Sequence, residues 1–146
     1  MIPYVVNFGK IYSMLITATI HSEPGKNEMA VSTNNFAKSI AIPCKPDGKG
    51  SSVNGGELLF LSLAVCYSND IYREAAKRKM HIDKVDVYVT GSFGKEGESA
   101  SDITYSVTIQ SPHSQKEIED LTEYVDRIAE VHNTLRKGIE VTLKKE

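Results

Sequence analysis

The feature that most constrains the fold is a long helical segment in the middle of the chain, at about residues 54–78. Its first half, residues 58–67, reads Leu-Leu-Phe-Leu-Ser-Leu-Ala-Val-Cys-Tyr and offers no polar face. A helix that is apolar on every side is normally a buried helix, so Leu61 is expected to be interior in the folded protein. Beyond Asn69 the segment becomes amphipathic. A helix of roughly 25 residues is about twice the mean length, so a partner subunit is expected to cover part of it.

The start of this helix carries its own signals. Asn54 can cap it, and Glu57 stands at the spacing of a reciprocal capping box. Gly55 and Gly56 are poor helix formers, and their bare backbone allows a ligand or another chain segment to approach closely.

The remaining segments alternate like strands or repeat like helices. Strands are predicted at 12–21, 28–33 and 37–42, with a loop over 44–53, and two further strands at 85–90 and 103–109. Ser114 and Glu117 form a second capping box before an amphipathic helix. A short turn over 132–137 ends at Gly138, and a closing strand is predicted at 139–143. The order βββ-α-ββ-α-β predicts an α+β fold, in a single domain over residues 1–146.

Composition narrows the functional classes. The net charge of −2 provides no general attraction to nucleic acid or to an anionic membrane. The longest apolar stretch, residues 58–65, is too short to span a bilayer. The first six residues show neither a basic region nor a small-residue cleavage site, so a secretory signal is not expected. Two cysteines without a CxxC pair predict reduced thiols and a cytoplasmic location. The four histidines lack the spacing of a helical metal site, so neither a metal nor a cofactor is expected.

Cys66 is the residue most suited to chemistry. A free cysteine inside an apolar helix is most often a small buried side chain. Here it lies about one helical turn before Asn69 and Asp70, where the helix becomes polar, so a position at the edge of the core is also possible. Tyr67, its neighbour, is a candidate for lining a pocket there.

The stretch Gly50-Ser-Ser-Val-Asn-Gly-Gly-Glu-Leu-Leu-Phe-Leu-Ser-Leu-Ala-Val-Cys66 resembles the OsmC/Ohr family, osmotically inducible and organic hydroperoxide resistance proteins. Their signature is a loop, an N-P-x-E-L-L-like helix start, a run of small residues and a reactive cysteine. The resemblance covers residues 14–144 and includes Asn133-Thr-Leu135 and Gly138-Ile-Glu-Val141 near the end. It implies an intertwined homodimer with two interface active sites, and reduction of organic hydroperoxides by a pair of thiols.

The chain departs from that pattern at three catalytic positions. The second cysteine of the family aligns with Ala129, and no arginine precedes Arg73 to lower the thiol pKa and hold the peroxide. The carboxylate that normally orients that arginine aligns with Gly56, while Glu57 matches the neighbouring position. Cations could come instead from lysines, namely Lys10, Lys26, Lys38 or Lys45, although a lysine lacks the fork of a guanidinium.

Two further residues are weighed as substitutes. Cys44, in the loop before the helix, is either an incidental loop cysteine or a displaced resolving partner. A resolving role requires the Cα atoms of Cys44 and Cys66 to lie within about 7 Å of each other. His132, close to the lost cysteine, is either a partner for a helix C-terminus or a polar substitute in the pocket.

Three functional hypotheses follow. The first is a thiol-dependent organic hydroperoxide reductase acting in oxidative-stress defence, with Cys66 as nucleophile. The second is a non-catalytic homodimer that binds an apolar small molecule in the interface pocket, using residues such as Glu57 and Tyr67. The third is a persulfide or acyl carrier with one working cysteine.

Overall fold

The computed structural model describes residues 13–145 and divides the chain into two compact units, Met1–Asn54 and Gly55–Glu146. The prediction of a single domain over residues 1–146 stays a prediction. Three sequence expectations concern positions outside the described residues: the N-terminal segment, Lys10 as a cation, and Tyr12 as the start of a strand.

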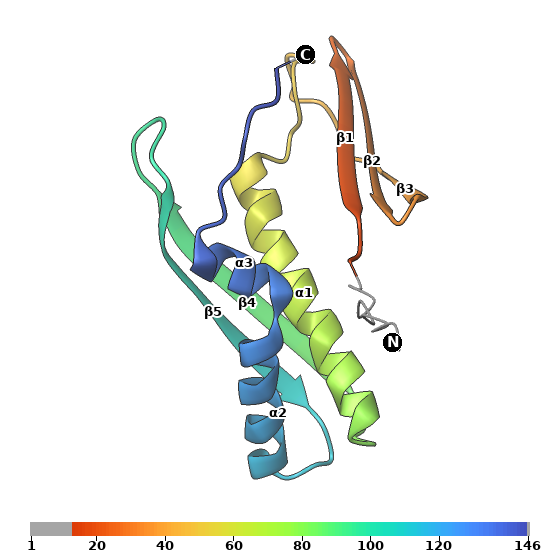
Figure 1. Ribbon diagram of the computed structural model, residues 1–146, viewed down its shortest axis with the longest axis vertical. Helices are drawn as coiled ribbons and strands as arrows, with labels where there is room; N and C mark the ends of the chain where they lie inside the picture. The colour runs from red at the N-terminus through yellow and green to blue at the C-terminus, as the bar shows by residue number, and fades with distance from the viewer. Residues whose placement is uncertain (1–12, 146) are drawn as a thin grey trace, which may run out of the picture. The chain divides into compact units, whose positions relative to one another are not determined.

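The first unit is an antiparallel meander. Strands β1 (Ile16–Glu23), β2 (Lys26–Thr33) and β3 (Phe36–Ile40) pair in the order β1-β2-β3, as predicted with small shifts of their ends (Figure 1). Asn34 and Asn35 join β2 to β3 with φ of 48° and 72°. Two consecutive residues with positive φ are typical of the tight turns whose twist matches that of paired strands.

The loop after β3 is held to the first hairpin. The amide of Gly25, in the β1–β2 turn, donates to the carbonyl oxygen of Gly48 at 2.8 Å. Cys44 and Ser51 form an isolated antiparallel bridge that closes the loop. Cys44 is half-buried and carries a free thiol.

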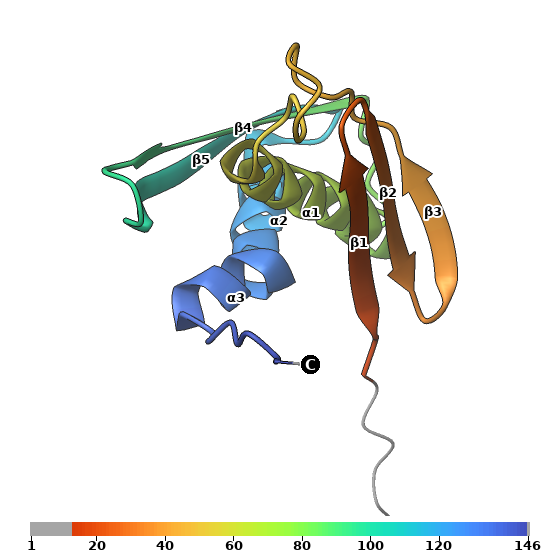
Figure 2. The same cartoon turned by 90° about the horizontal axis from the view of Figure 1, so that it is seen from above.

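The second unit places helices on one face of a long hairpin. Helix α1 (Gly55–Lys77) is followed by β4 (Lys84–Phe93) and β5 (Ala100–Gln110), then by α2 (Gln115–Ile128) and α3 (Glu130–Lys137). Figure 2 shows the three helices on the same side of the β4–β5 hairpin. Ring atoms of Phe60 on α1 lie only 2.8 Å from where a Cβ of Gly91 would stand, at a register shift in β4. A glycine is required there because the helix packs so closely on the strand.

The core of this unit forms between α1, α2 and the hairpin. Its largest fully buried side chains are Tyr67, Ile71, Leu121 and Val125. The Tyr67 hydroxyl donates to the carbonyl oxygen of Thr122 at 2.8 Å, which satisfies its polar end. The predicted capping box of α2, between Ser114 and Glu117, is confirmed by both of its hydrogen bonds.

Three expectations are corrected. Leu61 is not interior in the chain by itself, because its side chain lies on a face of α1 that leaves it 56% exposed. The turn over 132–137 is instead helix α3, although Gly138 ends it with φ of 61°, as predicted. The closing strand at 139–143 is absent from the described residues, where Val141 is 96% exposed and pairs with no strand. Alternation alone does not make a strand without an edge to pair with.

The rest of the predicted mixed α+β order is present. None of the helices in the described range 13–145 is long and apolar enough to cross a membrane.

Candidate functional site

Cys66 lies on the side of α1 that faces the break between α2 and α3. Ala129 ends α2 and precedes α3, and it is fully buried. The backbone amides of Val131 and Glu130, at the start of α3, face the Cys66 sulfur and act to lower the pKa of its thiol. The amides of a first helical turn have no partner inside the helix, and they favour an anion such as a thiolate.

Two carboxylates stand beside the same sulfur. The Cys66 Sγ and one oxygen each of Asp70 and Glu130 all lie within 4.8 Å of one another. Burial raises the pKa of the Cys66 thiol, and the negative charges of Asp70 and Glu130 raise it further. The amide of Val131 opposes this rise without cancelling it. The thiol is therefore more fully protonated near neutral pH than a free cysteine.

Asp70 is the most enclosed charged group of the site. It is 3% exposed, and its Oδ1 forms an ion pair with Nη1 of Arg73 at 2.7 Å. Its Oδ2 has no hydrogen-bond partner. Burial raises the pKa of Asp70, followed by repulsion from Glu130, whereas Arg73 lowers it.

Arg73 does not replace the arginine that the family places beside its cysteine. Its guanidinium is shared between Asp70 and Glu74, with Nε at 3.0 Å from Glu74 Oε1. Lys77 pairs with the same Glu74 oxygen at 2.7 Å. The two charges that act most strongly on the Cys66 thiol are both negative. A thiol is activated by a positive charge nearby, whereas the charges near Cys66 are negative.

A buried aromatic group lies beside this cluster. The His132 ring packs against Tyr105, with centroids 4.7 Å apart, and against Tyr67 at 5.8 Å. His132 is buried, and neither ring nitrogen has a hydrogen-bond partner. Burial lowers the pKa of His132, and Arg136 lowers it further, so the ring is neutral near pH 7. His132 lines a cavity of about 130 Å³ together with Tyr105 and Arg136. Its role as a polar substitute in an active-site pocket stays a prediction.

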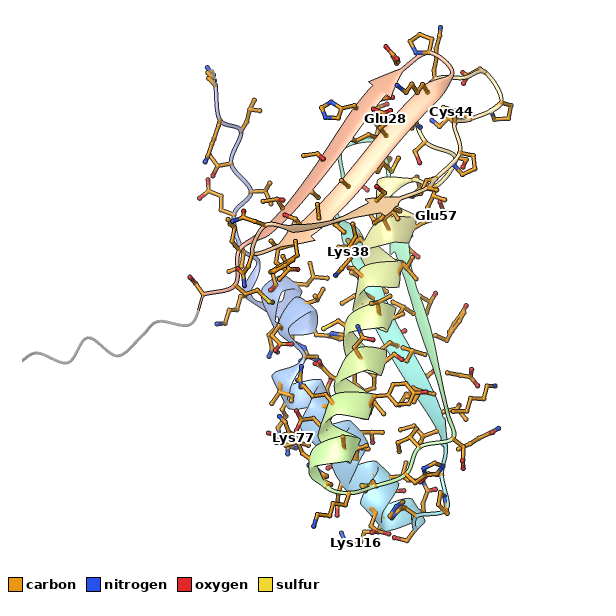
Figure 3. All side chains as sticks on the ribbon, turned by 90° about the vertical axis from the view of Figure 1, so that its right-hand side faces the viewer. Glu28, Lys38, Cys44, Glu57, Lys77 and Lys116 are labelled. Carbon is orange, nitrogen blue, oxygen red and sulfur yellow. The ribbon has the colours of Figure 1, made fainter. Side chains whose placement is uncertain are left out.

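The other predicted residues lie elsewhere. Glu57 is exposed in the first turn of α1, nine residues before Cys66, whereas Lys77 marks the last turn (Figure 3). Tyr67 points into the core with its hydroxyl on Thr122. Cys44 belongs to the first unit. The binding roles of Glu57 and Tyr67, and the resolving role of Cys44, stay predictions.

Asp70 and Glu130 are the residues that sequence reasoning missed, although each carried a signal. Asp70 follows Cys66 by four positions, which places both on the same side of a helix. Glu130 comes directly after Ala129, the position that aligns with the second cysteine of the family.

The fold and this cysteine-bearing helix define a class of small α+β proteins, and sequence comparison places the chain within it. The model of the family described as OsmC-like protein matches residues 48–144. The chain belongs to the OsmC-like family, as its resemblance predicted. No curated protein matches it.

Solved structures show the same fold. An OsmC-like protein from Mycoplasma pneumoniae is 23% identical over 85% of this chain and 87% of its own, with a TM-score of 0.60. A putative osmotic stress induced and detoxification response protein from Psychrobacter arcticus is 17% identical over 89% and 92%, with a TM-score of 0.62. An organic hydroperoxide resistance protein OsmC from Legionella pneumophila is 20% identical over 88% and 92%, with a TM-score of 0.53.

Proposed function

We propose that this OsmC-like protein is a thiol-dependent organic hydroperoxide reductase that works with a single cysteine, Cys66. The observation that carries the proposal is the position of the Cys66 sulfur beside the start of α3, where the backbone amide of Val131 acts to lower the pKa of the thiol. That amide stabilises the thiolate once it forms. Membership of the family supports the proposal, and so does similarity to proteins named for organic hydroperoxide resistance.

The proposed reaction has two stages. The Cys66 thiolate attacks one oxygen of the hydroperoxide, the O–O bond breaks, and the alkoxide takes up a proton and leaves as an alcohol. The sulfur keeps the hydroxyl group as a sulfenic acid. Because Ala129 aligns with the second cysteine, an external thiol then condenses with the sulfenic acid and releases water. A second external thiol reduces the mixed disulfide and restores Cys66.

The surroundings of the sulfur set the expected pH dependence. Burial and the charges of Asp70 and Glu130 raise the pKa of the thiol, so the reactive thiolate is scarce near neutral pH. We expect turnover to be slow at pH 7 and to increase as the pH rises through the thiol pKa.

A homodimer and a cytoplasmic location belong to the same proposal. Leu58, Leu61 and Val65 leave an apolar face on α1 exposed in the chain by itself, and a second copy would bury it. Both cysteines are free, as is usual in a reducing compartment. Two copies of α1 side by side would also bring a second chain close to Cys66.

The test is reduction of cumene hydroperoxide by the purified full chain with dithiothreitol as the external thiol. Cys66→Ser is expected to abolish turnover above the uncatalysed rate, whereas Cys44→Ser is expected to retain it. Turnover in Cys66→Ser equal to that of the unmodified protein would contradict the proposal. Loss of turnover in Cys44→Ser, with a Cys44–Cys66 disulfide seen by mass spectrometry, would make Cys44 the resolving residue.

Two observations favour a second candidate, a non-catalytic dimer that binds a small apolar molecule. The carboxylates beside Cys66 disfavour the thiolate, while His132 offers unused ring nitrogens to a largely apolar cavity. Absence of thiol-dependent turnover at any pH, together with ligand binding that His132→Phe weakens, would favour this candidate over the reductase.

A further inference from the structure

The same cluster has the composition of a metal site. We propose that Cys66, Asp70 and Glu130 together bind a divalent transition-metal ion of the zinc class. One sulfur and two carboxylate oxygens, from two helices, already lie within 4.8 Å of one another. Ligands bound at 2.0–2.3 Å to one ion are separated by roughly 3 to 4 Å, so the three donors are close to a shared coordination sphere without a change of fold.

Asp70 carries the strongest argument for a bound ion. Its side chain is more than nine-tenths buried, and its Oδ2 has no hydrogen-bond partner. Arg73 neutralises the carboxylate through Oδ1 only. The neighbouring carboxyl group is that of Glu130, which brings a second negative charge and no donor. A buried carboxylate facing another requires either a shared proton or a cation.

The donor set identifies the class of ion. Thiolate sulfur is a poor ligand for Mg²⁺ and Ca²⁺, which prefer oxygen, and a good one for zinc and similar ions. Three protein ligands leave one position open in a tetrahedral site. Glu130 is exposed, so an ion can enter from solvent and hold water at that position.

A bound cation would offset the negative charges around the Cys66 sulfur. The ion displaces the proton of the Cys66 thiol, so a sulfur–metal bond forms and one proton is released. The amides of Val131 and Glu130 then donate to a metal-bound thiolate, as outer hydrogen bonds commonly do. Without an ion, the two carboxylates repel the thiolate and disfavour it. With an ion, the thiolate and both carboxylates are attracted to the same cation.

This inference does not rest on the proposed reductase activity. It adds that a metal and a hydroperoxide compete for one sulfur, so the metal-bound chain is protected from oxidation at Cys66. Metal binding is measured here without any peroxide, and failure of either proposal is therefore visible by itself.

The test is a titration of the reduced full chain, free of any histidine tag, with Co²⁺ as a spectroscopic substitute for zinc. We expect one ion per chain, with a thiolate-to-cobalt charge-transfer band in the near ultraviolet. Cys66→Ser is expected to lose the band, and Asp70→Asn and Glu130→Gln are each expected to weaken binding at least tenfold. Cys44→Ser and Asp120→Asn, which changes an exposed carboxylate on α2, are the matched controls and should bind as the unmodified chain does.

Folding is separated from binding by circular dichroism of each variant. Asp70 is buried and its variant can lose structure, whereas Glu130 is exposed, so Glu130→Gln keeps the test decisive. Loss of the band in Cys66→Ser together with weakened binding in a folded carboxylate variant supports the site. Absence of bound cobalt in the folded, reduced chain would overturn it and leave the carboxyl pair with a shared proton. Unchanged binding in Cys66→Ser, or in both carboxylate variants, would overturn it equally.

Discussion

The two units differ in how far they bury their apolar residues. The unit from Gly55 contains a core in which Ile71, Leu121 and Val125 are fully buried. In the described part of the first unit, residues 13–54, no residue is buried, and Ile20 is 53% exposed although it lies in the middle of β1. Residues 13–54 of the first unit therefore form strands without a core, whereas the second unit has both strands and a core.

This contrast shows that pairing and burial are separate contributions. Backbone pairing and turn geometry suffice to define the meander, yet three strands need a covered apolar face to be stable. The helices and hairpin of the second unit cover one another. The cluster around Cys66 lies in that unit, where packing can hold side chains in a fixed arrangement.

The largest expected difference between the units is in the cost of removing an isoleucine. Ile71→Ala should lower the free energy of unfolding by about 2–5 kcal/mol, because it leaves a cavity in a packed core. Ile20→Ala, the matched change in the first unit, should cost less than about 1 kcal/mol. Urea denaturation of both variants measures this. A cost for Ile20→Ala that equals that of Ile71→Ala and depends on protein concentration would show that a second copy covers the sheet.

The buried histidine makes the second unit sensitive to acid. His132 has a lowered pKa in the folded chain, so the unfolded chain binds its proton at a higher pH, near 6.5. Stability attributable to His132 is complete above that pH and decreases as the pH falls toward the lower, folded pKa, by at most about 1.4 kcal/mol per pH unit.

The measurement is the difference in unfolding free energy between the natural chain and His132→Phe at several pH values. Phenylalanine preserves packing against Tyr67 and Tyr105 and removes two buried polar atoms. The variant should gain relative stability as the pH drops below 6.5. A difference that does not vary with pH would exclude His132 as the origin of acid sensitivity.

The reactivity of the Cys66 thiol tests whether the neighbouring carboxylates act on it. In a Cys44→Ser background, Asp70→Asn should lower the pKa of the Cys66 thiol, because it removes one of the two charges that raise it. Alkylation by iodoacetamide at neutral pH should then be several-fold faster. Asp86→Asn, an exposed carboxylate on β4, is the control and should leave the rate unchanged. An unaltered rate in Asp70→Asn would mean that this carboxylate does not act on the thiol.

The smallest expected effect concerns the start of α2. Ser114→Ala removes a capping box and should lower stability by about 1 kcal/mol. Ser99→Ala, an exposed serine in the β4–β5 loop, should change stability by less than about 0.5 kcal/mol. Hydrogen exchange of the α2 amides would locate the effect. An equal loss of hydrogen-exchange protection in both units would contradict their description as two compact units.

Several features were predictable because they depend on neighbours along the chain. The meander, the β4–β5 hairpin, the α2 capping box and the end of α3 at Gly138 follow from alternation, turn residues and caps. The helix that carries Cys66 was predicted from its apolar run, and the resemblance to the OsmC family rests on the same stretch. Periodicity reports these features because they involve residues within a few positions of one another.

What only the tertiary structure decided involves residues far apart in sequence. Residues 139–143 alternate like a strand but pair with no strand among residues 13–145. Leu61 is exposed because no described element of its unit packs on that face of α1. The sequence by itself identified Cys66 and showed that Ala129 stands where a second cysteine would be. In the folded chain, the break between α2 and α3 places the Val131 amide and the Glu130 carboxylate near the Cys66 sulfur. Asp70 lies beside them. The charge on a thiol depends on what surrounds it in space, and local pattern does not contain that information.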